Sequence, residues 1–470
     1  MLFLGRNVGF FALGCVDCHA LRMATEGSDK TISREKWRLM PPVPSTNLSQ
    51  PTPSSAPPSN HRAALSVVTT LFFMWGFLTC LNDILVPHLK AIFDLNYAQV
   101  MLIQFAFFSA YFIFSIPSAK VIDWIGYQKT MVLGLFVMAL GAVLFIPAAS
   151  VPSFPLFLGA LMVLAAGITA LQVAANPYVS VLGPARTASS RLNLTQAFNS
   201  LGTFLAPWFG KALILSTAAL SIAEMRQLSP DALHAYRQHE AATVKLPYLG
   251  LALALLVLGI VIGRFKLPAM PAAQHRVGDK SAGSVWQYRH LVLGAVGIFV
   301  YVGAEVAIGS FLVNYFSQSN IGNVSEKVAA GFVSYYWLSA MVGRFVGSAI
   351  LQKVRTGLVL GIAALAAASL VCVSMLTFGH VAMWSIILVG LFNSVMFPSI
   401  FTLGIAELGP LTGDGSGMLV MAIVGGAIIP VVQGALADRI GIHHAFILPV
   451  ICYLYIVFYA FRGSKPARIS

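Results

Sequence analysis

Two acidic residues lie in strongly apolar parts of this 470-residue sequence. Asp83 occurs in GFLTCLNDILVPHL and Glu305 in IFVYVGAEVAIGSFLVNY, each within the first long apolar stretch of one half of the chain. A charged side chain at the centre of a bilayer costs ~2.5 to 3.5 kcal/mol even on insertion scales, so an acid kept there usually pairs, coordinates an ion or carries a proton. The two carboxylates therefore predict a transporter coupled to an ion.

Each acid has an alternative interpretation. An acid that faces the two aqueous sides in turn can load a proton on one side and release it on the other, and we expect this of Asp83. Asp83 could instead be held by a hydrogen bond from Asn82 or Gln104 that only fixes helix packing. Glu305 lies at about the same depth in the corresponding helix of the second half, and it could equally be neutralised by a hydrogen bond between helices.

The composition is typical of a membrane protein. Hydrophobic residues make up 58% and charged residues 10% of the chain, and the mean hydropathy is +0.81, whereas soluble domains average about 25% charged residues. A helix that spans a bilayer needs roughly 20 consecutive, mostly apolar residues. Twelve such windows occur, at approximately 65–88, 98–120, 130–149, 153–182, 193–216, 245–265, 288–316, 328–352, 356–377, 380–406, 415–437 and 443–462.

The windows divide six and six around a polar, proline-containing segment, so we expect an all-α polytopic membrane protein with 12 transmembrane helices in two six-helix bundles. The Pro- and Ser-rich start of the chain is predicted to be disordered. The expected parts are a disordered N-terminal extension, an N-terminal bundle, a cytoplasmic linker, a C-terminal bundle and a cytoplasmic tail, at 1–60, 61–266, 267–287, 288–462 and 463–470.

The net charge of +13 could suggest a nucleic-acid partner, but the basic residues concentrate in the loops of one side. Membrane proteins keep Lys and Arg in cytoplasmic loops, so we expect both termini in the cytoplasm of a bacterial inner-membrane protein, and no nucleic acid. The pentapeptide CVDCH, starting at Cys15, has the spacing of covalent haem attachment. It lies in a segment without any globular pattern, so we expect no cofactor and no metal site.

Five segments carry a family resemblance: FFMWGFLTCLNDILVPHLK, AKVIDWIGYQKT, LQVAANPYVSVLGP, RLNLTQAFNSLGT and FNSVMFPSIFTLGIAELG. Together they resemble the fucose permease group of the major facilitator superfamily, and most closely its glucose/galactose transporter branch. The resemblance covers about Ala64 to Phe461. It implies a functional monomer that transports a sugar, and it matches Asp83 to the acid on which proton coupling in that group is thought to depend.

The resemblance includes one loop of the superfamily, and at one position this sequence differs from the fucose transporter. Asp123, Gly126 and Lys129 look like the superfamily's loop between helices two and three, which implies a gating role. Gln172 stands where the fucose transporter has a second essential Glu. A glutamine cannot carry a proton but can hydrogen-bond sugar hydroxyls, so this departure argues against L-fucose and fits the glucose/galactose branch.

Recognition of a neutral sugar needs amide and hydroxyl partners together with an aromatic face. The candidate substrate-binding residues are Trp75, Asn82, Gln104, Gln172, Asn176, Gln196, Asn199, Asn314, Tyr315 and Asn393. Gln172 and Asn176 share a helix face at spacing i, i+4, and Gln196 and Asn199 share one at i, i+3. Intramembrane amides also form interhelical hydrogen bonds worth ~0.6 kcal/mol on average, so each candidate could serve packing alone.

The sequence thus predicts a proton-coupled symporter that imports a hexose, glucose or galactose, across the lipid bilayer by alternating access. Coupling to Na⁺, with oxygen ligands around Asp83, stays open. Another sugar, such as fucose, mannose or an N-acetylhexosamine, also stays open, because one or two side chains decide such differences. An exporter of the same superfamily and a membrane enzyme are weaker alternatives, and we expect no enzymatic activity.

Overall fold

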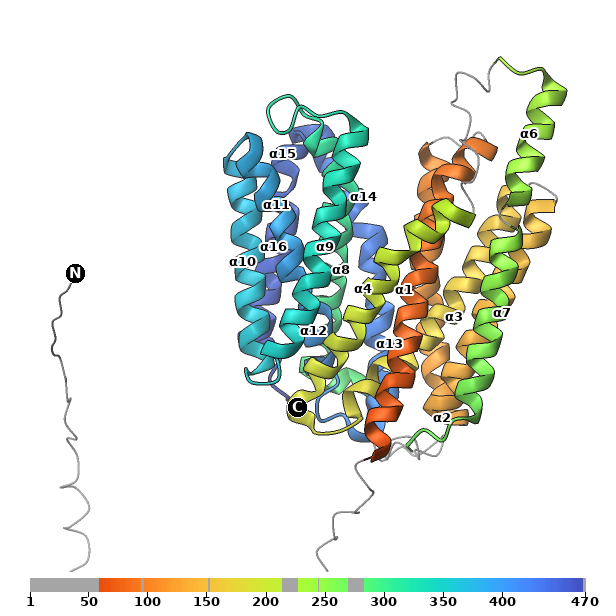
Figure 1. Cartoon of the computed structure of the whole chain (residues 1–470). Coiled ribbons are helices and arrows are strands. Elements are labelled where there is room, and N and C mark those ends of the chain that lie inside the picture. The colour runs from red at the N-terminus through yellow and green to blue at the C-terminus, as the bar shows by residue number, and fades with distance from the viewer. Residues whose placement is uncertain are drawn as a thin grey trace, which may run out of the picture. The chain divides into compact units, whose positions relative to one another are not determined.

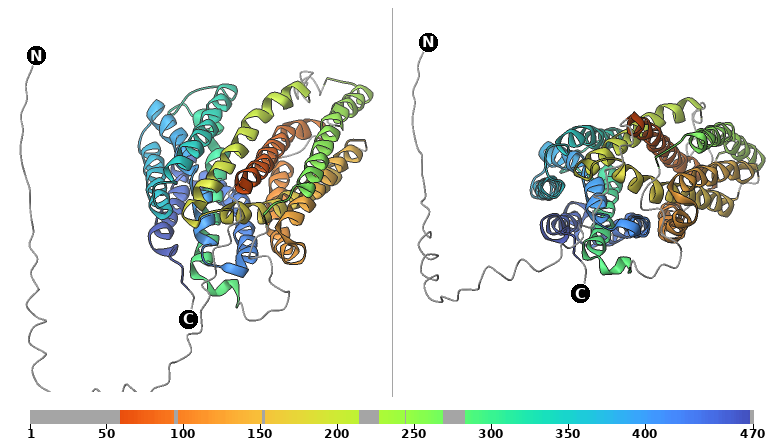
Figure 2. Two further views of the ribbon diagram at one scale, coloured as in Figure 1. Left: turned by 60° about the horizontal axis from the view of Figure 1, so that its bottom comes forward. Right: turned by 90° about the horizontal axis from the view of Figure 1, so that it is seen from below.

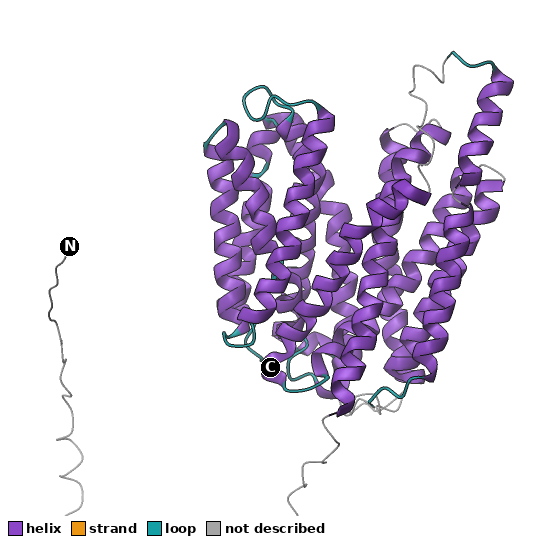
Figure 3. Cartoon of the chain, in the orientation of Figure 1, coloured by secondary structure: helices purple, strands orange, loops and turns teal. Residues whose placement is uncertain are grey.

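The computed structural model describes residues 59–93, 97–150, 153–213, 227–243, 245–268 and 283–467. Nearly all of the predicted N-terminal extension, with its CVDCH segment, and most of the predicted linker lie outside the described residues. Within those ranges the chain forms helices joined by turns and contains no strand (Figure 3). The expectation of an all-α fold is confirmed.

The first half of the chain supplies six labelled helices. They are α1 (Ser59–Phe93), α2 (Tyr97–Ser150), α3 (Phe154–Val181), α4 (Ala188–Leu213), α6 (Pro230–Thr243) and α7 (Lys245–Arg264). These helices pack mainly on one another, α2 against α3 and α7, and α1 against α4 (Figure 1).

The second half is built from shorter pieces. They are α8 (Arg289–Phe316), α9 (Glu326–Ile350), α10 (Thr356–Leu376), α11 (Gly379–Asn393), α12 (Met396–Gly404), α13 (Thr412–Met421), α14 (Gly425–Ile440), α15 (Ile442–Ala445) and α16 (Ile447–Phe458). They also pack mainly on one another, and α4 with α9 and α2 with α13 form the main seams between the halves (Figures 1 and 2).

Eight stretches of the described residues are long and apolar enough to cross a membrane. The stretch Leu102–Ala148 bends in its middle and contains two spans, while Gly379–Gly404, Gly409–Ile440 and Ile442–Gly463 each join consecutive short helices into one span. The helices α1, α4 and α9 correspond to the other three predicted spans, and they contain a larger share of polar residues. The part of the chain that the structure describes therefore holds the twelve predicted spans.

Two glycines reverse the chain at opposite ends of the helices. Gly126 bends α2 at φ 81°, ψ 167°, and Gly441 separates α14 from α15 at φ 81°, ψ 154°. Each follows an aspartate by three residues, as Asp123 and Asp438. We name the two ends of the helices the Gly126 face and the Gly441 face. The ends of α3, α7 and α9 and the starts of α4, α8 and α13 lie at the Gly126 face.

Replacing Gly126 by Ala is expected to destabilise the protein. The conformation of Gly126 is one that only glycine adopts readily, and holding another residue there costs about 1 to 3 kcal/mol, although a Cβ would find no atom within 4 Å. Thermal unfolding of the purified protein measures the loss. The matched control is Gly159→Ala in α3, whose Cβ also meets nothing within 4 Å at an ordinary φ; an equal loss in both variants would contradict the role of the backbone angle.

Candidate functional site

Two predicted amides of α3 lie buried beside α2. Gln172 donates its Nε2–H to Tyr111 Oη at 2.8 Å and is 2% exposed. Asn176, one helical turn further, is 0% exposed, and neither its Oδ1 nor its Nδ2 has a hydrogen-bond partner in the part of the chain that the structure describes. An unpaired buried polar group costs ~1 to 3 kcal/mol. Asn176 is therefore a ready partner for a bound polar molecule, whereas Gln172 is already held by a phenol.

The two amides of α4 take different roles. Asn199 donates its Nδ2–H to the backbone oxygen of Phe72 on α1 at 2.9 Å, so this amide ties α4 to α1. Gln196 is 5% exposed and its Nε2 has no partner. The sequence predicted a shared face for the pair, and within this structure only Gln196 keeps an amide group available for a ligand.

In the second half, Glu305 belongs to a buried hydrogen-bonded cluster. Tyr301 Oη lies 2.8 Å from Glu305 Oε1 and 3.1 Å from the backbone oxygen of Asn393. Asn393 in turn donates its Nδ2–H to Tyr336 Oη at 2.9 Å, and its Oδ1 has no partner. We call Tyr301, Glu305, Tyr336 and Asn393 the Glu305 cluster.

The geometry of the Glu305 cluster suits a carboxyl group that gains and loses a proton. Tyr301 has one hydroxyl hydrogen but two acceptors in reach, the Glu305 carboxylate and the Asn393 carbonyl. When Glu305 is ionised, the hydrogen of Tyr301 goes to the carboxylate. When Glu305 is protonated, it can donate to Tyr301 Oη, which then donates to the carbonyl, so both protonation states have hydrogen-bonded arrangements.

Hydrogen bonds between the halves lie toward the Gly126 face. Besides the contact of Lys120 with Asp414 described below, those within the described residues are Ser189 Oγ with Thr402 Oγ1 (2.6 Å) and Thr356 Oγ1 (2.9 Å), Ser190 Oγ to Ser348 O (2.7 Å), Asn193 Nδ2 to Arg344 O (2.7 Å), Ser416 Oγ to Val173 O (2.8 Å), and Arg344 Nη1 to Ser200 Oγ. In this arrangement the two halves are held together, and the protein is closed, at the Gly126 face.

The predicted gating loop contributes one ionic contact between the halves. Lys120 Nζ lies 2.9 Å from Asp414 Oδ1 on α13 and 3.6 Å from Asp123 Oδ2. Lys129, which the sequence placed in this loop, is exposed and makes no hydrogen bond or ion pair among the described residues. The basic residue of the predicted gating loop that contacts the second half is therefore Lys120, and its partner Asp414 was not predicted.

Breaking the Lys120–Asp414 contact is expected to have a modest effect. Half of the Lys120 side chain and a quarter of the Asp414 side chain are exposed, and exposed pairs contribute ~0.2 to 1 kcal/mol. Asp414→Asn should therefore shift the carrier toward the state open at the Gly126 face by up to about fivefold. The rate at which a thiol reagent labels Ser190→Cys measures the shift, and the charge swap Lys120→Asp with Asp414→Lys should restore the original rate.

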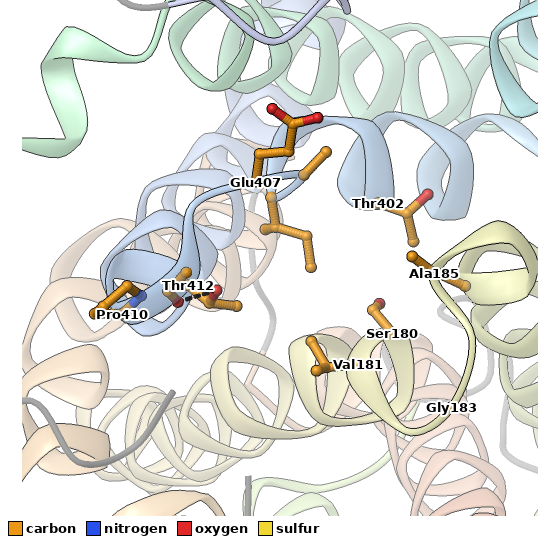
Figure 4. Close-up of a pocket in the computed structure, with 12 residues that line it drawn as sticks. Ser180, Val181, Gly183, Ala185, Thr402, Glu407, Pro410 and Thr412 are labelled. Atoms are coloured by element: carbon orange, nitrogen blue, oxygen red, sulfur yellow. Dashed lines mark hydrogen bonds between the residues drawn. The ribbon is translucent and has the colours of Figure 1, made fainter. Parts of the chain in front are cut away.

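A pocket of about 600 Å³ opens between the halves beside this latch. Figure 4 shows Ser180 and Val181 at the end of α3 on one side, and Thr402, Glu407 and Thr412 on the other. The walls therefore come from both halves, so separation of the halves would widen the pocket. No group of three or more His, Cys, Asp or Glu side chains suited to a metal ion occurs within the described ranges.

Comparisons with known proteins agree with this architecture. The family described as Major Facilitator Superfamily matches residues 64–423. The chain belongs to the Major Facilitator Superfamily. It is therefore a multi-pass membrane transporter and not an enzyme, and the fold expected from the sequence is confirmed.

Two curated relatives of this Major Facilitator chain carry functional names. A "Glucose/galactose transporter" of Brucella abortus is 55% identical over 406 residues, which cover 86% of this chain and 95% of the relative. The "L-fucose-proton symporter" of Escherichia coli is 36% identical over 411 residues, which cover 86% of this chain and 93% of the relative. The expected resemblance to this group is confirmed.

A solved structure matches the fold of this chain. The transporter FucP in the outward conformation superposes with a TM-score of 0.80 at 34% identity, over 85% of this chain and 98% of the other.

Four further predicted residues, Trp75, Gln104, Asn314 and Tyr315, lie on α1, α2 and α8. Tyr315 is at the last turn of α8, where its hydroxyl lies 3.0 Å from Ser374 Oγ and 3.2 Å from His443 Nδ1, and its neighbour Asn314 is exposed. These two residues are therefore at the Gly441 face, away from the Glu305 cluster. Gln104 is exposed on α2 and Trp75 is half-buried with its ring 5.5 Å from that of Phe72.

Helix α1 of this Major Facilitator chain includes both Asn82 and Asp83, but their side chains lie outside the described residues. Four polar side chains that the structure places at the site were not predicted from the sequence: Tyr111, Tyr301, Tyr336 and Arg344. Arg344 had a readable signal, because it interrupts the apolar run YYWLSAMVGRFVGSAI. Tyr301 precedes Glu305 by four residues, which is the spacing of neighbours on one helix face.

Proposed function

We propose that this protein imports a hexose, glucose or galactose, together with a proton by alternating access. The observation that carries the proposal is the 55% identity to a protein named as a glucose/galactose transporter, over almost the whole of that relative. Proton coupling is supported by the relative named as an L-fucose-proton symporter. Gln172, which bonds a phenol where the fucose transporter has an acid, supports a hexose other than fucose.

The described residues can supply the contacts that this function needs. Asn176 and Gln196 offer buried, unpaired amide groups from the first half, and Asn393 offers an unpaired Oδ1 from the second. Sugar hydroxyls both donate and accept, so a bound hexose could satisfy all three. Trp75 is the aromatic candidate. Asp83 and Glu305 are the proposed proton-carrying acids, and Glu305 has hydrogen-bonded arrangements in both protonation states.

We place the Gly126 face in the cytoplasm. Lys120, Lys129, Arg186 and Arg264 lie at or near this face, and basic residues mark cytoplasmic loops. Both termini would then be cytoplasmic, in a bacterial inner membrane, with 267–287 as the linker between bundles at 61–266 and 288–462. We further propose that the monomer is the transporting unit and that H⁺ and the sugar are its only ligands.

Uptake by proteoliposomes tests the proposal. Labelled glucose and galactose would be supplied under an inward proton gradient, an inward Na⁺ gradient or neither, and counterflow would be measured in parallel. Accumulation under the proton gradient alone is the expected result. Accumulation that follows Na⁺ would contradict proton coupling, and the absence of both accumulation and counterflow for either hexose would contradict the substrate assignment.

A further inference from the structure

Arg344 is a charged residue in the middle of the transport machinery that the proposed function does not yet use. It lies on α9 and is half-buried, and its Nη1 donates to Ser200 Oγ on α4, across the boundary between the halves. Its Nε is buried and has no hydrogen-bond partner among the described residues. A guanidinium keeps its charge in proteins and has five N–H donors. One neutral hydroxyl is therefore an incomplete partner for it.

Among the described residues, Glu305 is the acid whose charge acts on Arg344. The two groups interact electrostatically, yet no carboxylate oxygen of the described residues lies within ion-pair distance, 4.0 Å, of Arg344. Glu305 accepts instead from Tyr301. Among the described residues, the other titratable groups that face Glu305 are the phenols of Tyr301, Tyr336 and, from α16, Tyr453. All of these phenols are neutral at physiological pH, so Arg344 is the one cation among the described groups that face the acid.

The seam between α4 and α9 links Arg344 to the conformational cycle. Asn193 donates to the backbone oxygen of Arg344 at 2.7 Å, and Ser190 donates to that of Ser348 at 2.7 Å. A Cβ on Gly347 would come within 3.1 Å of Asn193 Nδ2, so the helices touch closely here. Opening of the Gly126 face must part α4 from α9. The guanidinium of Arg344 would then lose Ser200, its only hydrogen-bond partner among the described residues.

We propose that Arg344 is a positioning residue for proton release, bound to Ser200 while the Gly126 face is closed and to Glu305 once that face opens. The inference rests on the proposed function. In the open state the Glu305 O–H bond breaks, the proton passes to water entering from the Gly126 face, and the carboxylate forms an ion pair with the released guanidinium. Closure returns Arg344 to Ser200, and Glu305 can accept a proton from the other side.

The experiment compares Arg344→Gln, Arg344→Lys, Glu305→Gln and the double variant Arg344→Gln with Glu305→Gln in proteoliposomes. We expect Arg344→Gln to retain counterflow, which needs no proton release, while its proton-driven accumulation falls to the equilibrium ratio of one. Raising the internal pH should restore net uptake, because the proton then leaves Glu305 without help. Arg344→Lys should restore part of the accumulation, and the double variant should be no worse than Glu305→Gln alone.

Arg355→Gln is the matched control, because Arg355 is an exposed arginine just beyond the end of α9. Normal accumulation by Arg344→Gln would overturn the inference. Loss of counterflow together with accumulation, in a variant whose thermal unfolding is unchanged and which Ser200→Ala reproduces, would also overturn it and leave Arg344 as a structural tie. A wild-type protein that accumulates no hexose contradicts the proposed function itself, whereas wild-type accumulation matched by Arg344→Gln contradicts only the role of Arg344.

Discussion

Asp83→Asn is expected to abolish uphill accumulation of hexose while exchange of labelled for unlabelled sugar continues. The amide removes the proposed proton carrier of α1 but keeps its size and hydrogen-bonding capacity. Moving one charge through 100 mV releases ~2.3 kcal/mol, which corresponds to about 50-fold accumulation at one proton per sugar. The variant should therefore lower the ratio of internal to external sugar from tens to one. Proton-driven uptake and counterflow in the same proteoliposomes measure both quantities.

The matched control for this prediction is Asp438→Asn, because Asp438 is an exposed aspartate near the Gly441 face. It should accumulate sugar like the wild type. Full accumulation by Asp83→Asn would remove Asp83 from the coupling mechanism and leave Glu305 as the proposed carrier. Loss of counterflow as well as accumulation would indicate that Asp83 binds sugar or holds the helices together.

Gly417→Trp is expected to stop transport by holding the Gly126 face open. Gly417 lies on α13, where a Cβ would come within 2.9 Å of the Cβ of Ala119 and 3.2 Å of the backbone oxygen of Ser115 on α2. Overpacking of this kind costs ~1 to 3 kcal/mol. Because the indole of tryptophan is bulky, we expect a cost near the upper end of that range. Since the clash exists only when α2 and α13 meet, the closed state should become up to about 150-fold rarer.

Three measurements separate this outcome from misfolding. Net uptake should fall by the same factor as the population of the closed state, labelling of Ser190→Cys from the Gly126 face should become faster, and thermal unfolding should change little. Gly250→Trp is the control, because Gly250 is exposed on α7 and a Cβ there meets nothing within 4 Å. Slower labelling of Ser190→Cys in Gly417→Trp would contradict the predicted direction.

The helices could be predicted from the sequence because each span must satisfy one strong requirement, about 20 apolar residues without exposed backbone polar groups. The site could be predicted only in part. Gln172, Asn176 and Asn199 are chemically similar amides in apolar spans, yet one bonds a phenol, one bonds nothing and one bonds the backbone of α1. Those differences depend on which atoms of other helices lie within about 3 Å, and the order of residues does not contain that distance.

Depth in the membrane was the second source of difference. Tyr315 and Glu305 belong to the same span, but α8 is 28 residues long. They are ten residues apart in the sequence, and at 1.5 Å per residue this separates them by about 15 Å along the helix. The sequence shows that Tyr315 is a polar residue of this span. It does not show how deep in the membrane Tyr315 lies. Arg344 shows the reverse case, since its charge is evident in the sequence and only its contact with Ser200 gives it a role.

The Gly126 face is closed mainly by contacts without net charge. Five of them join hydroxyl or amide groups to hydroxyls or backbone carbonyls, and such bonds average ~0.6 kcal/mol each in a membrane protein, about 3 kcal/mol together. Electrolyte screens charges but leaves neutral hydrogen bonds almost unchanged. In a cell that passes from dilute to concentrated surroundings, the ratio of closed to open states at the Gly126 face would thus stay nearly the same. Osmotic stress would then change sugar uptake through the proton gradient and not through these contacts.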